Sequence, residues 1–362
     1  RHGRRTVGPD VALQYDTPTW DRLEQLLARA TALSTSRRIE FLDEVAAEEP
    51  HIAEELATLL SLTSPSSRFF RKLESKLFDD DEYEDTGAVL ARFDPLIGET
   101  FADRYELETV RGRGGMGTVY RAKDLESGEI VAVKALSKRL SEDRAGRKRF
   151  FREARTMAKL RHPNVCPVLD AGEAEDGTPF LVMPYFEGTT LSKRLRTGAL
   201  PLDEAIDWFE QACAGLGAIH KARIVHRDLS PANLIRTPDG RVIILDFGLA
   251  RLRNVTLGTR SRELGTLPYM APEQLKDDKV DRRADVWAIA AIFYEMVSGQ
   301  RPFGGASISE VHDAILESEP APLHTLQPAV SERLSEAVAR ALEKAHDRRL
   351  PDIGKLAAAV RG

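Results

Sequence analysis

Three side chains in the second half of the chain have types and a spacing that suit phosphoryl transfer. Asp228 ends a His-Arg-Asp tripeptide, Asn233 follows five residues later, and Asp246 begins an Asp-Phe-Gly tripeptide after an apolar run. A carboxylate can accept the proton of an attacking hydroxyl, and Mg²⁺ prefers carboxylate and amide oxygens. The spacing predicts that Asp228 is the base and that Asn233 and Asp246 are the metal ligands. Both tripeptides together are a far more specific signal than either alone.

A glycine-rich segment nearer the N-terminus is suited to hold phosphates. Gly112, Gly114 and Gly117 form a GxGxxG pattern, whose backbone amides can approach phosphate oxygens without a Cβ in the way. The pattern alone is weak, because dinucleotide-binding folds use it at the start of a helix. Here a strand-like run follows, and Lys134 comes seventeen residues after Gly117 in an apolar segment. This order predicts a strand hairpin over ATP phosphates, with a strand lysine that contacts them.

Lys134 requires a counter-charge if its strand is buried, because an unpaired buried ammonium is costly. Glu153 is the candidate partner, since it lies in a segment with helical periodicity over residues 147–160. The apolar residues at helical spacing in this segment are Phe150, Ala154, Met157 and Leu160. A solvated surface glutamate is the alternative, and only the lysine upstream favours the ion pair.

Taken in order, these motifs resemble the protein kinase family, in its bacterial Ser/Thr branch, over about Tyr105 to Val360. Three more segments are similar to family landmarks: FLVMPYFEG at 180–188 to the hinge, GTLPYMAPE at 265–273 to the substrate-positioning loop, and DVW at 285–287 to the start of a central helix. The resemblance implies an α+β fold of two lobes, a β-rich lobe with one main helix and a helical lobe. Strand-like runs followed by helical periodicity agree with this class.

The resemblance implies a role for each matching residue. Lys134 would bind the α- and β-phosphates and pair with Glu153, and Asp228 would be the catalytic base. Asn233 and Asp246 would bind Mg²⁺, with Mn²⁺ as an alternative, and proteins would be the substrates of the ATP-dependent reaction. The residues implied around ATP are Gly112, Gly114, Gly117, Val119, Ala132, the gatekeeper Met183, Pro184, Phe186, Leu234 and Ile235.

Other matching positions are implied to be structural or regulatory. Asp285 would brace the catalytic loop, which is the segment from His226 to Asn233, and Arg349 would pair with Glu273. Arg227 precedes the catalytic Asp and would receive a phosphate from the activation loop, which runs from 246 to 273. The candidate phosphorylation sites in this loop are Thr256, Thr259 and Ser261. Ordinary loop hydroxyls are the alternative for each of them.

Two positions depart from the family pattern. Ser230 stands where Ser/Thr kinases usually place a lysine near the γ-phosphate, and loss of that cation should slow transfer. Some bacterial relatives resemble this chain there, so we interpret the serine as tolerated. The Ser/Thr preference then rests on Thr266, which we group with the regulatory residues, and on the lack of a tyrosine-kinase-type Arg in the catalytic loop. Pro184 replaces an acidic hinge residue but keeps the carbonyl that adenine uses.

Three functions are compatible with these residues. The leading hypothesis is an ATP- and Mg²⁺-dependent Ser/Thr protein kinase with autophosphorylation of its activation loop. A nucleotide-binding pseudokinase, acting as a scaffold or allosteric partner, is the alternative, and Ser230 is its only support. A small-molecule kinase is disfavoured, because the complete segment up to Ala-Pro-Glu is typical of kinases that dock peptides.

The chain before this region predicts a separate module. Residues 1–78 show helical periodicity, for example at Leu23 and Leu27, and we interpret them as a helical module for interaction or regulation. The acidic run DDDEYED predicts a linker over 79–98. The kinase-like domain would cover 99–362, with a first lobe over 99–183, a hinge over 184–188 and a second lobe over 189–362.

Composition limits the other functions. A net charge of −5 argues against a nucleic-acid binder, and no apolar stretch is long enough to span a membrane. Cys166 and Cys213 lack the spacing of a zinc site or a disulfide scaffold, so we expect buried small side chains in a reducing compartment. We expect a cytoplasmic location, with the cytoplasmic part of a longer membrane-anchored protein as the alternative. A homodimer is left open.

Overall fold

The computed structural model divides into two compact units, Arg1–Asp79 and Asp80–Gly362. It describes eight helix or loop positions from Arg22 to Ile52, then Asp94, and residues 96–114, 117–136, 144–246, 266–276, 279–305 and 307–361. In the first unit, the described apolar residues are helical and buried: Leu26, Phe41, Val45 and Ile52. Leu23 and Leu27 of the predicted helical pattern lie outside the described residues.

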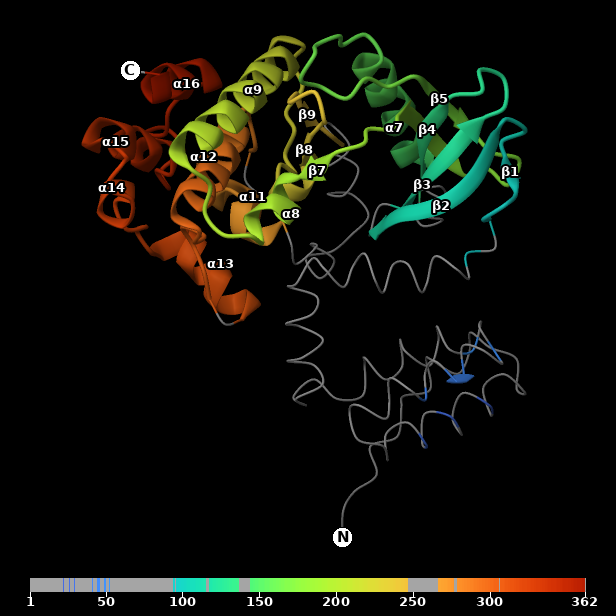
Figure 1. Ribbon diagram of the computed structural model, residues 1–362, viewed down its shortest axis with the longest axis horizontal. Coiled ribbons are helices and arrows are strands. Elements are labelled where there is room, and N and C mark those ends of the chain that lie inside the picture. The colour runs from blue at the N-terminus through green and yellow to red at the C-terminus, as the bar shows by residue number, and fades with distance from the viewer. Residues whose placement is uncertain are drawn as a thin grey trace. The chain divides into compact units, whose positions relative to one another are not determined.

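A six-stranded antiparallel sheet forms the first lobe of the second unit, with the strand order β1-β2-β3-β4-β6-β5 (Figure 1). The strands are β1 (Thr100–Phe101), β2 (Tyr105–Gly114), β3 (Gly117–Asp124), β4 (Ile130–Leu136), β5 (Asp170–Glu173) and β6 (Pro179–Pro184). The sheet is covered by apolar side chains on both faces, and strand β6 shows this because its alternate residues enter different hydrophobic clusters. Val182 packs with Val133 in one cluster, whereas Leu181 packs in the other.

The main helix of this lobe is α7 (Arg144–Met157). Phe150, Ala154 and Met157 are buried on one face in the cluster that also contains Leu181. This is the predicted apolar stripe, and it arises because residues three and four apart share a helix face. The helix ends at Met157, earlier than the predicted 160, so the partly buried Leu160 lies just beyond it.

The predicted linker over 79–98 extends too far toward the C-terminus. Asp94 is buried and accepts a hydrogen bond from the Tyr120 hydroxyl at 2.9 Å. Gly98 donates its N–H to the Leu107 carbonyl at 2.7 Å. A buried carboxylate requires such partners, and here they come from the sheet. The described end of this segment therefore belongs to the strand lobe.

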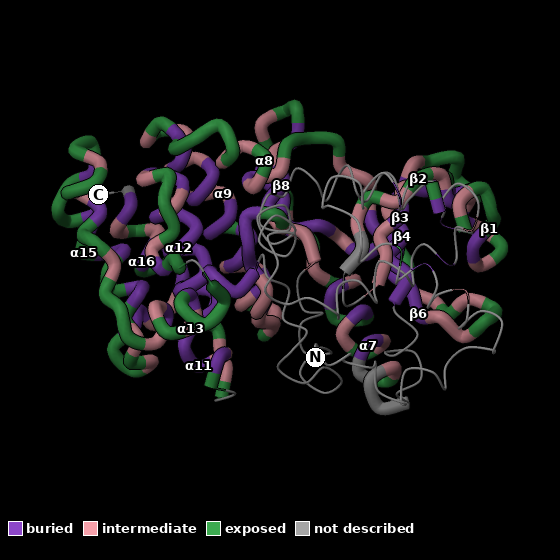
Figure 2. Tube along the Cα trace, turned by 90° about the horizontal axis from the view of Figure 1, so that it is seen from below, coloured by how far each residue is buried: buried purple, intermediate pink, exposed green. Residues whose placement is uncertain are grey.

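Helices form the second lobe, at the other end of this unit (Figure 1). They are α8 (Leu191–Leu195), α9 (Leu202–Lys221), α11 (Pro272–Leu275), α12 (Arg283–Ser298), α13 (Ile308–Glu317), α14 (Leu323–Leu326), α15 (Glu332–Ala341) and α16 (Ile353–Arg361). Helix α12 is buried along nearly its whole length, as Figure 2 shows, which makes it the centre of the lobe. Among the residues that the structure describes, no helix has both the length and the apolar character needed to cross a membrane.

A small antiparallel sheet lies where the two lobes meet. Its strands are β7 (Thr189–Thr190), β8 (Leu234–Arg236) and β9 (Val242–Ile244). Strand β8 directly follows Asn233, and β9 ends two residues before Asp246. The sheet thereby brings together the two predicted metal ligands, although they are far apart in sequence.

Candidate active site

The strand lobe contributes Lys134 from the middle of β4. Its side chain is buried, and its Nζ lies 2.9 Å from Oδ2 of Asp246. Asp246 has a left-handed backbone with φ of 53°, which is uncommon for a residue with a side chain. Such strained positions concentrate at functional sites. The contact joins a phosphate-binding candidate from one lobe to a metal-ligand candidate from the other.

Glu153 is the residue that we predicted to pair with Lys134. It lies on α7, and both of its carboxylate oxygens are buried. In the structure, Lys134 forms an ion pair with Asp246. The Lys134–Glu153 pair therefore stays a prediction.

Asp285 anchors the catalytic loop from the N-terminal turn of α12. Its fully buried carboxylate accepts the backbone N–H groups of His226 and Arg227, both at 2.8 Å. Nε2 of His220 lies 2.7 Å from the same carboxylate. Burial by itself would raise the pKa of Asp285, but the hydrogen bond and charge of His220, together with the loop N–H groups, bring that pKa below its usual range. An ionised Asp285 thus holds Arg227, whose φ is 67°, in a left-handed conformation.

His226 links the candidate base Asp228 to the residue before Asp246, the predicted metal ligand. Its Nε2 lies 3.0 Å from the Leu245 carbonyl, and its Nδ1 accepts the N–H of Asp228 at 3.3 Å. A carbonyl can only accept, so this network assigns the ring proton to Nε2. The Leu245 N–H in turn donates to the Asn233 carbonyl at 2.9 Å. Asp228, Asn233 and the residue before Asp246 therefore belong to one hydrogen-bonded unit.

The side chain of Asn233 is oriented so that it can bind a cation. Its Nδ2 donates to the backbone carbonyl of Asp228 at 2.6 Å, which leaves Oδ1 as the oxygen for a metal. The Asp246 side chain is 29% exposed, so its carboxylate remains accessible. An amide oxygen and a carboxylate suit a hard divalent cation that completes its coordination with waters and phosphate oxygens. These two residues fit the predicted metal.

An apolar cluster forms where an adenine ring was predicted to bind. Ala132 and Met183 face each other in the β4–β6 register, and both pack with Ile235 and Phe186. Leu234 is 1% exposed and packs in the core of the helical lobe instead. Neighbouring residues of a strand point to opposite faces, so only one of the two β8 residues can lie beside Ala132. We therefore keep Ile235 and remove Leu234 from the predicted adenine contacts.

Both cysteines are buried, as expected from their sequence context. Cys166 belongs to the cluster around Met183, and burial raises the pKa of its thiol. It therefore remains protonated and packs as a small apolar side chain.

The glycine-rich segment forms the hairpin between β2 and β3, as the sequence predicts, and no helix follows it. Gly114 and Gly117 face each other in the register, and Val119 lies opposite Lys134 on β4. Gly117 has a φ of 143°, and a Cβ there would lie 2.0 Å from the Ala135 carbonyl oxygen. Only glycine fits this turn.

The segment between Asp246 and Glu273 is described only at its end. Thr256, Thr259 and Ser261 lie outside the described residues. Thr266 is buried, at the start of the 3-10 helix η4 (Leu267–Tyr269).

Glu273 on α11 forms a buried, two-point ion pair with Arg349. Nη1 of Arg349 lies 2.6 Å from Oε1 of Glu273, and Nη2 lies 2.9 Å from Oε2. The same guanidinium donates to the carbonyls of Glu343 and Arg283. The pair fixes the end of the activation segment on the helical lobe.

Gln274 is a site residue that the sequence analysis missed. Its Nε2 donates to the Arg227 carbonyl at 2.7 Å, and its Oε1 accepts the Ala271 N–H at 3.1 Å. The strained Arg227 is therefore held on both sides, by Asp285 at its N–H and by Gln274 at its carbonyl. A glutamine after Ala-Pro-Glu resembles any surface glutamine, so no sequence signal distinguished it.

Comparison with known proteins agrees with this geometry. Residues 105–354 match the family model of the protein kinase domain. Serine/threonine-protein kinase PknB of Mycobacterium leprae is 37% identical over 249 residues, which are 67% of this chain and 40% of PknB. PknA of Mycobacterium tuberculosis is 40% identical over 235 residues, which are 63% of this chain and 54% of PknA.

The fold has known counterparts as well. The crystal structure of the Mycobacterium tuberculosis PknI kinase domain matches with a TM-score of 0.59 and 28% identity, over 73% of this chain and 97% of that domain. The family match covers the strand lobe from β2 onward, the loop from His226 to Asn233, Asp246 and most of the helical lobe. The chain therefore belongs to the protein kinase family.

Proposed function

We propose that this chain is a serine/threonine protein kinase, which transfers the γ-phosphoryl group of ATP to protein hydroxyls with the help of Mg²⁺. The observation that carries the proposal is the single network that connects Asp228 and Asn233 with Lys134 and Asp246. It combines a base, two hard oxygen ligands and a buried cation, which are the parts that phosphoryl transfer needs. The named Ser/Thr kinases among the relatives support the same activity.

Each residue has a distinct task in this proposal. Asp228 accepts the proton of the substrate hydroxyl as the oxygen attacks phosphorus. Lys134 and the glycine-rich hairpin bind the phosphates, while Asn233 and Asp246 hold the cation. A bound divalent cation supplies positive charge to the phosphate oxygens. Oxygen ligands suit both Mg²⁺ and Mn²⁺, and we propose Mg²⁺ as the cation with Mn²⁺ as the alternative.

The test is phosphate incorporation by the full chain. We expect label from [γ-³²P]ATP to appear on the chain itself and on myelin basic protein, and acid hydrolysis to yield phosphoserine and phosphothreonine. Parallel reactions with Mg²⁺ and with Mn²⁺ at equal concentration test the preference for Mg²⁺. Binding of ATP with no transfer under either metal would favour the pseudokinase alternative. Label on tyrosine alone would contradict the Ser/Thr assignment.

Gln274 provides a second test, because it acts through the catalytic loop. We expect Gln274→Leu to lower kcat by about fivefold while the KM for ATP stays within about twofold, since the lost hydrogen bond to Arg227 contributes about 1 kcal/mol and does not touch ATP. Gln274→Glu keeps the acceptor for Ala271 but loses the donor, so it should behave similarly.

Steady-state kinetics at saturating peptide measure both constants. The matched control is Gln300→Leu, which removes an exposed glutamine in the same lobe. An equal loss in the control, or a change in the KM for ATP without a change in kcat, would remove Gln274 from the positioning role.

A further inference from the structure

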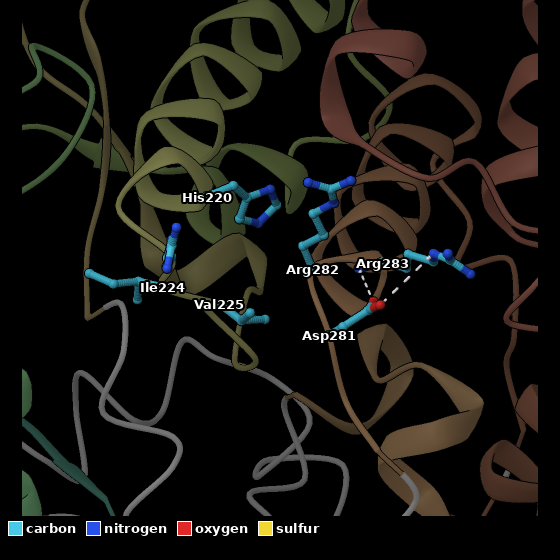
Figure 3. A pocket seen from close by; sticks show the side chains of 7 residues that line it. His220, Ile224, Val225, Asp281, Arg282 and Arg283 are labelled. Carbon is cyan, nitrogen blue, oxygen red and sulfur yellow. Dashed lines mark hydrogen bonds and ion pairs between the residues drawn. The ribbon is translucent and has the colours of Figure 1, made fainter.

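A pocket of about 330 Å³ lies in the helical lobe, between the end of α9 and the start of α12 (Figure 3). Its apolar lining is Ile224 and Val225. Its other lining residues are mostly cationic: Arg223, Arg282 and Arg283, with His220 and the single carboxylate of Asp281. Three arginines against one aspartate give this pocket a net positive charge, in a chain whose net charge is −5.

The carboxylate in this pocket already has partners. Oδ1 of Asp281 lies 3.0 Å from Nε2 of His346, and Oδ2 lies 3.9 Å from Nε of Arg283. Arg283 also donates to the His346 carbonyl at 2.6 Å. The side chains of Asp281 and Arg283 therefore both have a close partner in His346, and the cationic groups that remain for a ligand belong to the other two arginines.

Arg282 and Arg223 keep donor groups available. Arg282 is exposed, and its Nε donates to the Pro351 carbonyl at 3.0 Å, which leaves both Nη groups of its guanidinium. Its side chain lies beside His220 in Figure 3. Within the described part of the chain, no partner is present for the exposed Arg223 guanidinium. Each arginine can thus offer N–H groups to an incoming anion.

The backbone of Arg223 is strained in a way that positions its charge. Its φ is 60°, and it follows the last turn of α9, where its N–H bonds to His220 and the next N–H bonds to Ile219. Glycine is usual at this position of a helix end, because a side chain costs about 1 kcal/mol in the left-handed conformation. An arginine is present instead, and it adds a cation to the pocket.

We propose that this pocket binds a phosphoryl group. Guanidinium groups present planar pairs of donors that match phosphate oxygens, and the N-terminus of α12 adds a favourable dipole for an anion. The phosphoryl group comes from free phosphate or from a phosphorylated side chain, and both present the same dianion to the arginines. The pocket contains His220, which contacts Asp285, so a ligand there lies one side chain away from the anchor of the catalytic loop.

Binding can be measured on the full chain after removal of its own phosphates with a phosphatase. The probe is a fluorescein-labelled pentapeptide of alanines with a central phosphoserine, followed by anisotropy, and inorganic phosphate is the competitor. We expect saturable binding, and a loss of affinity of about tenfold in Arg223→Gly and in Arg282→Gln, since each removes a charge-assisted contact. Arg223→Gly also relieves the left-handed strain, so this variant should remain folded.

The matched control is Arg340→Gln, which removes an exposed arginine from α15 and should change affinity less than twofold. Displacement by phosphate near the Kd of the peptide would identify free phosphate as the source, and much weaker displacement would identify a phosphorylated side chain. Equal binding of the unphosphorylated peptide, or unchanged affinity in Arg223→Gly, would overturn the proposal. No turnover is needed, so the outcome is independent of the proposed kinase activity.

Discussion

Replacing Asp228 with Asn is expected to slow phosphoryl transfer by about 10²–10⁴-fold, the range that a positioned general base contributes. An amide cannot accept the proton of the substrate hydroxyl at neutral pH. The loop itself should survive, because the bonds from Asp228 to His226 and Asn233 use its backbone N–H and carbonyl. We therefore expect the affinity for ATP to stay within about twofold of the wild type.

Initial rates at saturating Mg-ATP, together with a separate nucleotide titration, distinguish the two effects. Asp347→Asn is the matched control, because it makes the same change at an exposed position of the helical lobe. A variant at Asp228 that keeps more than about a tenth of the wild-type rate would show that another group takes the proton. Loss of ATP binding in parallel would instead indicate a collapsed loop.

The chemistry-bearing residues could be predicted because phosphoryl transfer allows few side-chain types at each point. A base requires a carboxylate, a hard cation requires oxygen ligands, and a phosphate loop requires glycine where the backbone must approach closely. The strand-like run after Gly117 also separated a hairpin from a dinucleotide fold, and the structure confirms the hairpin. Separate blocks of strand-like and helical sequence indicate the α+β class, whereas the two lobes were implied by the resemblance to the protein kinase family.

Other features depend on packing that no local pattern encodes. Leu234 and Ile235 are both apolar, and only the register of β8 decides which one packs beside Ala132. The position of Asp94 in the strand lobe depends on a tyrosine 26 residues away in sequence. The contact between Lys134 and Asp246 depends on how the lobes close, which neither residue determines alone.

The roles of polar residues outside the motifs could not be predicted from the sequence either, because they too depend on the tertiary structure. Gln274 and Arg223 look like ordinary surface residues, because their types are common there. Gln274 became recognisable only when its amide was seen between two backbone groups of different segments. Arg223 became recognisable through its left-handed backbone, because an arginine in the sequence does not reveal that its position at a helix end is one where glycine is usual.

The second large effect is expected in stability, from the ion pair between Glu273 and Arg349. Arg349→Met should lower the free energy of unfolding by about 3–5 kcal/mol, because it leaves the Glu273 carboxylate buried without its counter-ion. Arg349 is 2% exposed and Glu273 is 5% exposed, so water cannot replace the lost partner. The carbonyls of Glu343 and Arg283 also lose a donor.

Urea unfolding followed by circular dichroism measures the loss, and a double variant separates charge from packing. Arg349→Met with Glu273→Leu should recover most of the lost stability, since it removes the stranded charge and keeps the volume. The control is Arg241→Met, which breaks an ion pair with Asp239 whose side chains are 52% and 55% exposed, and it should leave the unfolding midpoint unchanged. If the double variant were no more stable than Arg349→Met alone, the stranded charge of Glu273 would not be the cause of the loss. The loss would then come from the carbonyl contacts of Arg349, which both variants lack.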